Sequence, residues 1–370
     1  MRRTERKPHV VFDMTFPRRL GTGGTTVYAD ELVAALRERD LYRVTCVAEQ
    51  LPVRRRGAWR IWNGVHNLLW TQLVLPIKLL WLGADLLHAP SYFAPILCPC
   101  PLVLTVFDVL YLKNPPTRRG KLWALYSRFF ITRAIRRANV ICTISNVSRA
   151  EIEGANRIPA DRIRVAHLGV NPRYQPQAEA DLELVRQKYG LSRPFFLFVG
   201  SWVRRKNIPR LIEAFQIFRE NIEADYELIL VGPQDSGAPE VLSRLQDPEI
   251  AKHVRYLGIV ADEDMPSIYG SSEAFVFPSL GEGFGLPMIE AMACGTPVIA
   301  SNVSCLPEVA GDAALFINPE DTADIARAMK LVLEPDLRRK LKDKGFQRAQ
   351  FFTWANTAME TEKAYADALR

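Results

Sequence analysis

The sequence predicts an α/β protein that contains two doubly wound parallel sheets. Its 370 residues, 48% of them hydrophobic, can build more than one core, and a chain of this length is expected to form about two domains. Short apolar segments alternate with helical patterns along the chain, which is typical of strands and helices wound around parallel sheets. The length therefore predicts the number of domains, and the alternation predicts their class.

Each half of the chain contains six short apolar segments that we predict as strands. In the first half these are residues 9–14, 43–50, 85–88, 102–107, 140–144 and 163–168. A glycine-rich turn and an amphipathic helix over residues 21–39 follow the first of them. In the second half the strand segments are residues 195–200, 226–232, 253–258, 274–278, 297–301 and 314–318.

The polar segment 171–181, which contains prolines, is interpreted as the linker between the halves. We predict a first domain over residues 1–173, a second over 174–352, and a final segment, 353–370, whose helix returns to the first domain. Each domain would be Rossmann-like, and two such sheets would face each other across a cleft at the carboxyl ends of their strands. Clefts of this kind bind the ligands of α/β proteins.

The cysteines and the apolar segments of the chain indicate the cellular compartment in which the protein works. The six cysteines lie mostly in apolar segments without CxxC spacing, which indicates free thiols in a reducing compartment. No secretory signal is recognisable, because the apolar segment after the basic residues 1–7 is too short. The most apolar segment, residues 68–84, contains Pro76 and Lys78 and is shorter than the about 20 apolar residues of a spanning helix. We expect a cytoplasmic protein that is soluble or attached peripherally to a membrane.

The two halves differ in charge. The net charge is +7, but residues 1–170 hold 26 Lys and Arg against 12 Asp and Glu, whereas residues 171–370 hold 22 against 29. Much of the basic excess lies in residues 54–62, 118–121 and 128–137, and tryptophans stand among or near these cations. This pattern favours an anionic membrane surface at the inner face of the cytoplasmic membrane, or an anionic acceptor. The tryptophans in question are Trp59, Trp62, Trp70 and Trp81.

The basic half of the chain is open to other interpretations. The cations could occupy ordinary solvated helix faces while the tryptophans belong to the core. Nucleic acid is a poorer explanation, because no helix-turn-helix, RNP or zinc-finger pattern accompanies the charge.

Three adjacent cations follow the first strand of the second half. Gly200 ends this strand, and Arg204, Arg205 and Lys206 come directly before the next helix. Cations at the carboxyl end of a strand are well placed to neutralise a diphosphate. The alternative is a solvated loop, but the position favours binding.

The segment 278–302 combines a glycine-rich turn with two acids. Glycines around Glu282 interrupt the strand pattern, Pro287 suits the first turn of a helix, and that helix carries Glu290. Free backbone N–H groups at such a turn attract anions, and missing side chains let a ligand approach closely. Two carboxylates beside an anion site suit a ligand with both phosphate and hydroxyl groups, as in a nucleotide-sugar. The alternative for these acids is stabilisation of the helix dipole.

The chain also contains two weaker motifs. The turn at residues 21–25 lacks the third glycine of a dinucleotide fingerprint, since Thr26 stands there, although Glu49 imitates the ribose-binding acid. A dehydrogenase is therefore not favoured. The acids at 262–264 have the form of a metal ligand but precede a helix, where acids act as caps, so that we predict no metal there.

The chain from residue 195 onward resembles the donor domain of the retaining family 4 glycosyltransferases of GT-B fold. The resemblance covers most of these 176 residues and rests on VGSWVRRKN, FVFPSLGEGFGLPMIEAMACGTPVIAS, SCLPEVAGDAALFINPED and FFTWANTA. The first half matches more loosely, through GTGGTTVYADELVAAL, DLLHAPSYFAP, TVFDVLYL, ICTISNVSRAEI and RIRVAHLGVNPRY. The subgroup it resembles contains mannosyl- and rhamnosyltransferases of bacterial surface polysaccharide assembly.

The resemblance implies roles for four side chains. Glu290 would bind the ribose hydroxyls of a nucleotide-diphosphate sugar, and Glu282 the hydroxyls of the donor sugar. Arg205 and Lys206 would bind the diphosphate and stabilise the leaving group, so that no metal and no cofactor is needed. A GDP-sugar, with mannose or rhamnose, is favoured as donor, and a saccharide or lipid-linked saccharide as acceptor.

The resemblance also implies roles for backbone groups. The amides of Phe284, Gly285 and Leu286 would support the diphosphate. Gly23 and Gly24 would let the first helix approach the phosphates from the other domain.

The first half departs from the family pattern at one position. The family usually has His before Asp in the segment TVFDVLY, but here Phe107 precedes Asp108. Asp108 and His88 remain candidates for the first domain. His88 could equally be a strand-end residue with a structural hydrogen bond.

The resemblance further implies transfer with retention of the anomeric configuration, by attack on the face that the leaving group departs from. A sugar-nucleotide epimerase, a phosphorylase or a nonenzymatic sugar-nucleotide-binding protein can share the same architecture, because a fold does not determine a function. The acid pair and the cations favour transfer among these alternatives.

Overall fold

This computed structural model describes residues 6–20, 24–49, 65–107, 121–156 and 158–370. The predicted site residues Gly23 and Asp108 lie outside them, as do most of the basic residues 54–62 and 118–121. The chain forms two compact units, residues 1–169 with 354–370 and residues 170–353. The sequence-based boundaries, after residues 173 and 352, lie within four residues of these crossings.

The first unit contains a six-stranded parallel sheet in the order β2-β1-β3-β4-β5-β6. All six segments predicted in this half form strands, and four of these strands are buried along their whole length, as in a sheet that helices cover on both faces. The strands are β1 (His9–Asp13), β2 (Arg43–Val47), β3 (Leu86–Ala89), β4 (Leu102–Thr105), β5 (Val140–Thr143) and β6 (Ile163–Val165).

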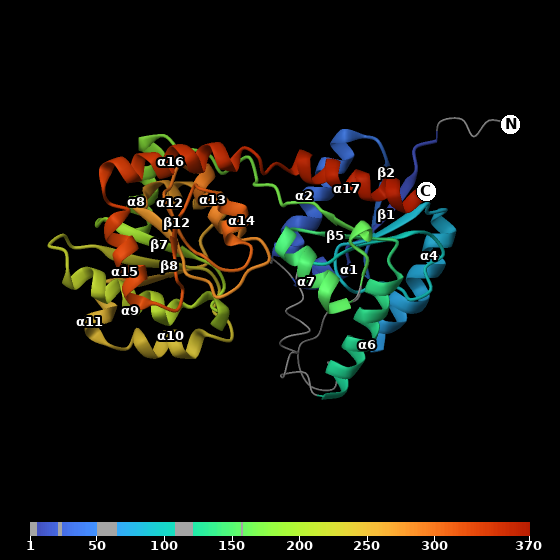
Figure 1. Ribbon diagram of the computed structural model, residues 1–370, viewed down its shortest axis with the longest axis horizontal. Helices are drawn as coiled ribbons and strands as arrows, with labels where there is room; N and C mark the ends of the chain where they lie inside the picture. Colours follow the sequence, from blue (N-terminus) through green and yellow to red (C-terminus); the bar gives the residue numbers. More distant parts are fainter. Residues whose placement is uncertain (1–5, 21–23, 50–64, 108–120, 157) are drawn as a thin grey trace. The chain divides into compact units, whose positions relative to one another are not determined.

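Helices cover both faces of this sheet (Figure 1). One face carries α2 and α17, and the other carries α4, α6 and α7. The bounds are α1 (Thr15–Leu20), α2 (Gly24–Arg39), η1 (Trp70–Val74), α4 (Leu75–Leu82), α6 (Lys121–Arg137), α7 (Asn146–Asn156), η3 (Ala160–Arg162) and α17 (Trp354–Leu369). Across all described residues, we found no helix with the length and apolarity required to traverse a bilayer.

The C-terminal helix α17 belongs to the first unit, as the sequence predicted. The Tyr365 hydroxyl lies 2.7 Å from Nδ1 of His88 on β3. Glu362 pairs with Arg39 of α2 at 2.8 Å. Because these partners lie far apart in the sequence, the helix ties the end of the chain to its beginning.

The second unit repeats the architecture with the strand order β12-β11-β10-β7-β8-β9, again all parallel. The six predicted segments of this half also form strands. They are β7 (Phe195–Val199), β8 (Glu227–Val231), β9 (Val254–Gly258), β10 (Ala274–Phe277), β11 (Val298–Ser301) and β12 (Leu315–Ile317).

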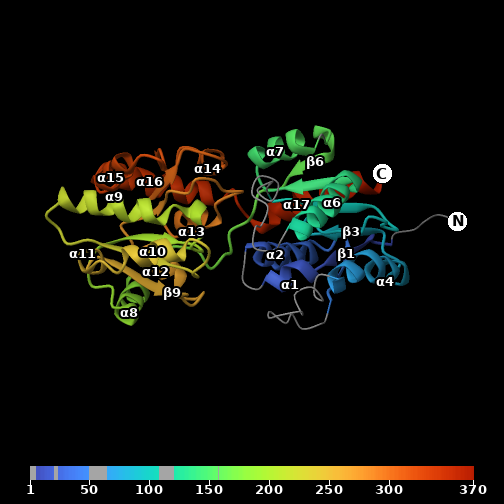
Figure 2. The same ribbon diagram turned by 90° about the horizontal axis from the view of Figure 1, so that it is seen from below.

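Helices α9, α10 and α15 lie on one side of this second sheet, and α8, α12, α13 and α16 on the other (Figure 1). Figure 2 shows the same two units from below. The helices are α8 (Glu179–Tyr189), η4 (Arg204–Lys206), α9 (Ile208–Glu220), α10 (Ala238–Arg244), α11 (Pro248–Ala251), α12 (Met265–Ser271), α13 (Leu286–Ala293), α14 (Leu306–Ala310), α15 (Thr322–Leu331) and α16 (Pro335–Ala349).

The strand order of the second sheet reverses next to β7. From β7 the chain moves outward through β8 to β9, and it then returns to place β10 on the other side of β7. The loops after β7 and β10 therefore leave the sheet at its switch point, where open α/β sheets bind ligands.

All six cysteines are free thiols, as the sequence predicted.

Candidate active site

Two loops meet at the switch point of the second sheet. One follows β7 and contains the predicted cations, and the other follows β10 and contains Glu282. The amide of Leu280 donates to the carbonyl of Arg205 at 2.8 Å. The side-chain amide of Asn207, which is buried, donates to the carbonyl of Pro278 at 3.1 Å. The two predicted motifs, more than seventy residues apart in the sequence, are thus bonded to each other.

Gly200 turns the chain out of β7 toward the site. Its φ of +153° lies where side chains are disfavoured, and a Cβ there would lie 3.4 Å from Cε of Lys206. The positive φ therefore favours glycine at this strand end, and the Lys206 side chain packs close to it.

Both predicted cations converge on Glu282. Nη1 of Arg205 lies 2.5 Å from one carboxylate oxygen, and Nζ of Lys206 lies 2.8 Å from the other. Arg205 also donates to the carbonyl of Gly281 at 3.0 Å. The Lys206 ammonium stands over the ring of Phe277, 4.2 Å from its centroid, where the ring face attracts a cation. Three charged groups that the sequence predicted as one site therefore form one cluster.

Two of the three charged side chains in this cluster, Lys206 and Glu282, are buried, and burial shifts the pKa of each. Burial lowers the pKa of Lys206, and the neighbouring Glu282 only partly offsets this. Burial by itself would raise the pKa of Glu282, but Lys206 and Arg205 hold it below its usual value. Arg205 is more open, with 40% of its side chain exposed. Arg205 is thus the more accessible of the two cations, whereas Lys206 is buried.

The turn after Glu282 leads into α13 through a backbone conformation that requires glycine. Gly285 has φ +91°, and a Cβ there would lie 2.7 Å from Cδ2 of Leu306. Leu286 begins the helix, and Phe284 packs its ring against Phe352. The predicted backbone donors at residues 284–286 thus lie at the N-terminus of an eight-residue helix, which favours negative charge.

Glu290 lies on the same helix, is partly buried, and accepts hydrogen bonds from two tyrosines. Tyr269, which is fully buried, donates its hydroxyl to Oε2 of Glu290 at 3.0 Å. Burial raises the pKa of Glu290 to about 7, although hydrogen bonds from Tyr269 and Tyr174 act in the opposite direction. This carboxyl is therefore poised between its neutral and charged forms near physiological pH.

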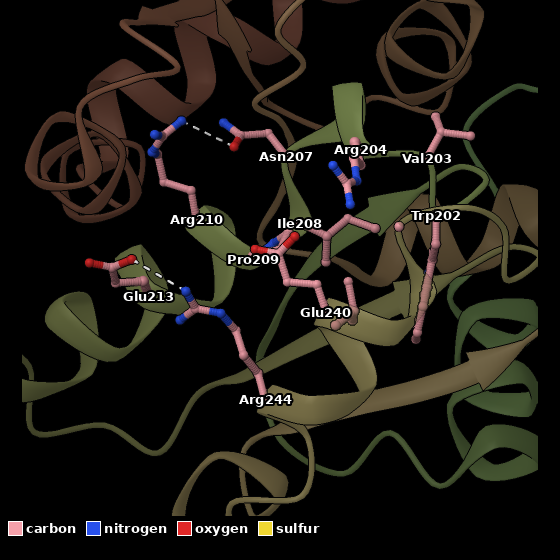
Figure 3. Close-up of a pocket in the computed structure, with 12 residues that line it drawn as sticks. Trp202, Val203, Arg204, Asn207, Ile208, Pro209, Arg210, Glu213, Glu240 and Arg244 are labelled. Atoms are coloured by element: carbon pink, nitrogen blue, oxygen red, sulfur yellow. Dashed lines mark hydrogen bonds and ion pairs between the residues drawn. The ribbon is translucent and has the colours of Figure 1, made fainter. Parts of the chain in front are cut away.

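Arg204, the third predicted cation, lies apart from this cluster. It lines a hollow of about 170 Å³ near the starts of α9 and α10, together with Arg210 and Arg244 (Figure 3). Arg205, Lys206 and Glu282 are not among the lining residues. The basic triplet thus separates into two cations that contact Glu282 and one that does not.

Among the acids at 262–264, Asp264 does not cap the helix as the sequence predicted. Asp264 precedes α12 but makes no capping hydrogen bond from its side chain. Its carboxylate instead accepts hydrogen bonds from Lys188 and Tyr189, each at 2.7 Å. The prediction of a cap is therefore wrong for Asp264, because α8 supplies stronger donors.

Of the four site residues predicted in the first unit, the structure describes only His88 and Gly24. His88 is fully buried, with Nδ1 near Tyr365 and Nε2 2.8 Å from the Thr105 hydroxyl, and burial lowers its pKa to about 3. Both ring nitrogens are thus used inside the core, which favours the structural alternative over a binding role. Gly24 is the first residue of α2, with nothing within 4 Å of a Cβ built on it.

Two side chains that contact this cluster or Glu290, those of Phe277 and Tyr269, were not among the predicted site residues. Phe277, under the Lys206 ammonium, was included in a predicted strand but given no role. Tyr269, on Glu290, lies in a short helix and carried no signal, because its function depends on packing between α12 and α13. Sequence spacing around α13 could identify Glu290 but not the hydroxyl that holds it.

Comparison with known proteins identifies the family. The model described as Glycosyltransferase Family 4 matches residues 22–174, and that described as Glycosyl transferases group 1 matches residues 183–348. The O-antigen chain mannosyltransferase B of Escherichia coli is 34% identical over 301 residues, which cover 80% of this chain and 78% of that protein. The chain belongs to glycosyltransferase family 4.

This family 4 glycosyltransferase also resembles part of a longer protein. The serotype-specific mannosyltransferase WbdA of Escherichia coli is 30% identical over 281 residues, which cover 73% of this chain but only 34% of WbdA. Among solved structures, Anabaena Alr3699/HepE in complex with UDP and glucose has a TM-score of 0.75 at 19% identity, covering 97% of this chain and 99% of that one. That likeness confirms the predicted GT-B fold.

Proposed function

We propose that this glycosyltransferase moves a hexosyl residue, with mannose favoured and rhamnose second, from a nucleotide-diphosphate sugar to an acceptor in surface polysaccharide assembly. The acceptor would be a saccharide or a lipid-linked saccharide. Two relatives with the word mannosyltransferase in their names support the choice of sugar. We favour GDP as the nucleotide. The Anabaena neighbour was solved with UDP, so the base is the first property to test.

One observation supports this proposal above the others. Arg205 and Lys206 converge on Glu282 at the switch point, beside the N-terminus of the helix that carries Glu290. Cations and a helix N-terminus suit a diphosphate, and two acids suit hydroxyl groups. A nucleotide-sugar contains both kinds of group within one ligand.

The proposed chemistry needs neither a metal nor a cofactor. The bond between the sugar anomeric carbon and the diphosphate oxygen breaks, and the acceptor hydroxyl oxygen forms the new glycosidic bond. The acceptor proton passes to the departing phosphate oxygen. Negative charge grows on the diphosphate during this step, so that Arg205 and Lys206 stabilise the transition state more than the bound substrate. Attack from the leaving-group side would retain the anomeric configuration.

We propose a peripheral location at the inner face of the cytoplasmic membrane. The excess of Lys and Arg over Asp and Glu in residues 1–170 supports this location, because anionic lipids attract basic segments. A lipid-linked acceptor would be met at the same surface.

Lys206→Ala, with Arg204→Ala as its matched control, tests the proposed function. Melting temperatures are first measured with GDP, UDP, ADP and dTDP, since a ligand that binds the native state raises its stability. Turnover of the corresponding mannosyl donor is then measured as nucleotide release. We expect Lys206→Ala to lower turnover at least about tenfold, since a charged contact is worth about 1.5–3 kcal/mol. Arg204→Ala should remain within about twofold of the parent, because exposed cations away from a site contribute little.

Several outcomes would contradict the proposal. Equal turnover in the parent and Lys206→Ala would exclude the cation cluster from the reaction. Nucleotide binding without donor turnover in any variant would favour a binding protein. Interconversion of nucleotide-sugars without release of nucleotide would favour an epimerase.

A further inference from the structure

An exposed apolar stripe runs along the helix that precedes β3. Residues 65–69, η1 and α4 form this continuous helix. Seven of its large apolar side chains are exposed. Five of them form a stripe in which the spacing is three or four residues, apart from the adjacent Leu80 and Trp81, and Trp81 is 86% exposed. These stripe residues are Leu69, Leu73, Ile77, Leu80 and Trp81. Soluble proteins rarely leave so many large apolar groups together in water.

The helix has a local irregularity that keeps the stripe on one side. Pro76 cannot donate a hydrogen bond, and in a regular α-helix its ring would clash with the carbonyl four residues earlier. The preceding turn is instead π-helical, and Leu75 donates to the carbonyl of Trp70, five residues back. The wider turn lengthens the helical repeat, so that side chains four apart remain aligned through this segment.

The opposite side of the helix packs against the hydrophobic core of the first unit. Leu75 and Leu79 are buried in one hydrophobic cluster with Ile131 and Ile135 of α6. The stripe is therefore not the core-facing side of the helix, and the hydrophobic cluster formed by the described residues of the first unit does not include it.

The neighbouring helix α6 adds positive charge to the same surface. Its buried residues contact the cluster described above, and both helices cover the same face of the sheet (Figure 1). On its outward side α6 exposes Phe129 with Arg133, whose guanidinium lies 5.2 Å from the ring centroid, followed by the exposed Arg136 and Arg137. The outward sides of the two helices therefore point away from the sheet together.

Neither helix contains an acid. Residues 65–84 and 121–138 include six Lys and Arg but no Asp or Glu. Lys78 stands at the margin of the stripe, with its ammonium 5.5 Å from the centroid of the Trp70 ring. Apolar side chains bordered by cations and indole rings match the acyl and headgroup layers of an anionic bilayer. An ordinary protein partner would not require the complete absence of acids.

We propose that the stripe on residues 69–81 inserts into the interface of an anionic membrane while the cations of α6 contact its headgroups. This inference rests on the peripheral location proposed above but not on the transfer reaction. The helix lies flat, because one side is committed to the core and only the other is free to enter lipid. The proposed membrane contact is thus made by residues of the first unit that the structure describes.

Vesicle flotation of the full chain tests this surface. The vesicles are phosphatidylcholine alone and phosphatidylcholine mixed with phosphatidylglycerol. We expect the parent to float mainly with the anionic vesicles, and Leu80→Gln with Trp81→Gln to lower its bound fraction about tenfold or more. The matched control is Leu80→Gln against Leu184→Gln, since these leucines are 65% and 64% exposed, the latter on α8. Only Leu80→Gln should weaken flotation.

A second pair of variants tests the charge. Arg133→Gln with Arg136→Gln should reduce flotation on anionic vesicles, whereas Arg339→Gln with Lys340→Gln, two exposed cations on α16, should not. Absence of parent flotation on either vesicle would overturn the proposal, as would equal flotation of the Leu80 and Leu184 variants. A dimer in sedimentation that Leu80→Gln with Trp81→Gln dissociates would show instead that two copies of the chain share this face. Flotation uses no donor, so loss of turnover cannot be confused with loss of binding.

Discussion

Glu290 combines the binding role that we propose for it with a cost in stability. Glu290 is partly buried, and burial raises the pKa of its carboxyl to about 7. Tyr269 and Tyr174 favour the charged form but do not overcome the effect of burial. A ribose with two hydroxyl donors would stabilise the carboxylate further, since hydrogen bonds to the charged form lower a pKa. Nucleotide binding and deprotonation of Glu290 should therefore support each other.

Glu290→Gln should change the pH dependence of stability. A carboxyl has a pKa of about 4.3 in the unfolded chain, so between that value and about 7 the folded parent binds more protons than the unfolded chain. The free energy of unfolding of the parent should thus decrease as pH rises through this window. Glutamine does not titrate, so the variant should gain about 1–3 kcal/mol relative to the parent from pH 5 to 7.5.

Urea unfolding of the parent and Glu290→Gln at both pH values measures this difference. Glu240→Gln on α10 is the control, since that acid is exposed and away from Tyr269. A constant difference between the parent and Glu290→Gln across the window would contradict the assigned burial of the carboxyl.

Residue identity was predictable where the chemistry is local in sequence. Glu282 and Glu290 share one turn-and-helix segment, and the cations upstream of this segment favoured a binding role for the two acids over stabilisation of the helix dipole. The basic triplet was only partly predictable, because Arg204 and Arg205 are neighbours in sequence yet Arg204 lines a separate hollow. Which cation contacts Glu282 depends on the 3₁₀ turn that follows β7, and no pattern in the sequence encodes its side-chain directions.

At the scale of elements, the strands were predictable because they are short, apolar and buried. Their carboxyl ends were less so. The segment predicted over residues 163–168 forms β6 only to Val165, and that over 102–107 forms β4 only to Thr105. In both cases one more backbone bond continues the sheet, from Ala166 to Thr143 and from Val106 to Cys142, before the chain turns away. Apolar sequence continues past these points because the loops themselves pack against the sheet.

The ends of β7 and β8 approach each other so closely that Gly232→Ala should be strongly destabilising. Gly232 has φ +125°, and a Cβ there would lie 2.4 Å from the carbonyl oxygen of Gly200. The obstacle is backbone, so a side-chain rotation cannot relieve it. We expect a loss of about 2–4 kcal/mol, in which strain of the dihedral angle and the steric clash both contribute.

Gly258→Ala provides the matched comparison for Gly232→Ala. It has φ +77° but nothing within 4 Å of its Cβ, so that only the dihedral strain remains, worth about 1–2 kcal/mol. Denaturant midpoints of both variants measure the difference. Equal losses would mean that the two strand ends can separate without cost, and the cation loop after β7 would then be less firmly held than we infer.

At the scale of the whole molecule, the chain crosses between the units twice. The crossings at residues 169–170 and 353–354 lie close together, since the amide of Val170 donates to the carbonyl of Phe352 at 2.9 Å. The return of α17 was predictable from a helical pattern after the last strand and from the family resemblance. Its partners were not, because Arg39, His88 and Arg164 are brought to it only by the folded sheet.

Deletion of residues 354–370 should therefore destabilise one unit far more than the other. Helix α17 buries Trp354, Ala358, Ala364 and Tyr365 in the first unit, so its loss exposes that core, while the second unit keeps all strands and helices of its own. Hydrogen exchange should show lost protection in β3 to β6 with retained protection in β7 to β12. Removal of Arg370 alone, an exposed residue, is the control. Tyr365→Phe should show a smaller effect of about 1–2 kcal/mol, confined to the first unit, because the His88 ring loses its partner. Uniform loss of protection in both units would mean that they unfold as one cooperative body, and the division of the chain into two cores would be wrong.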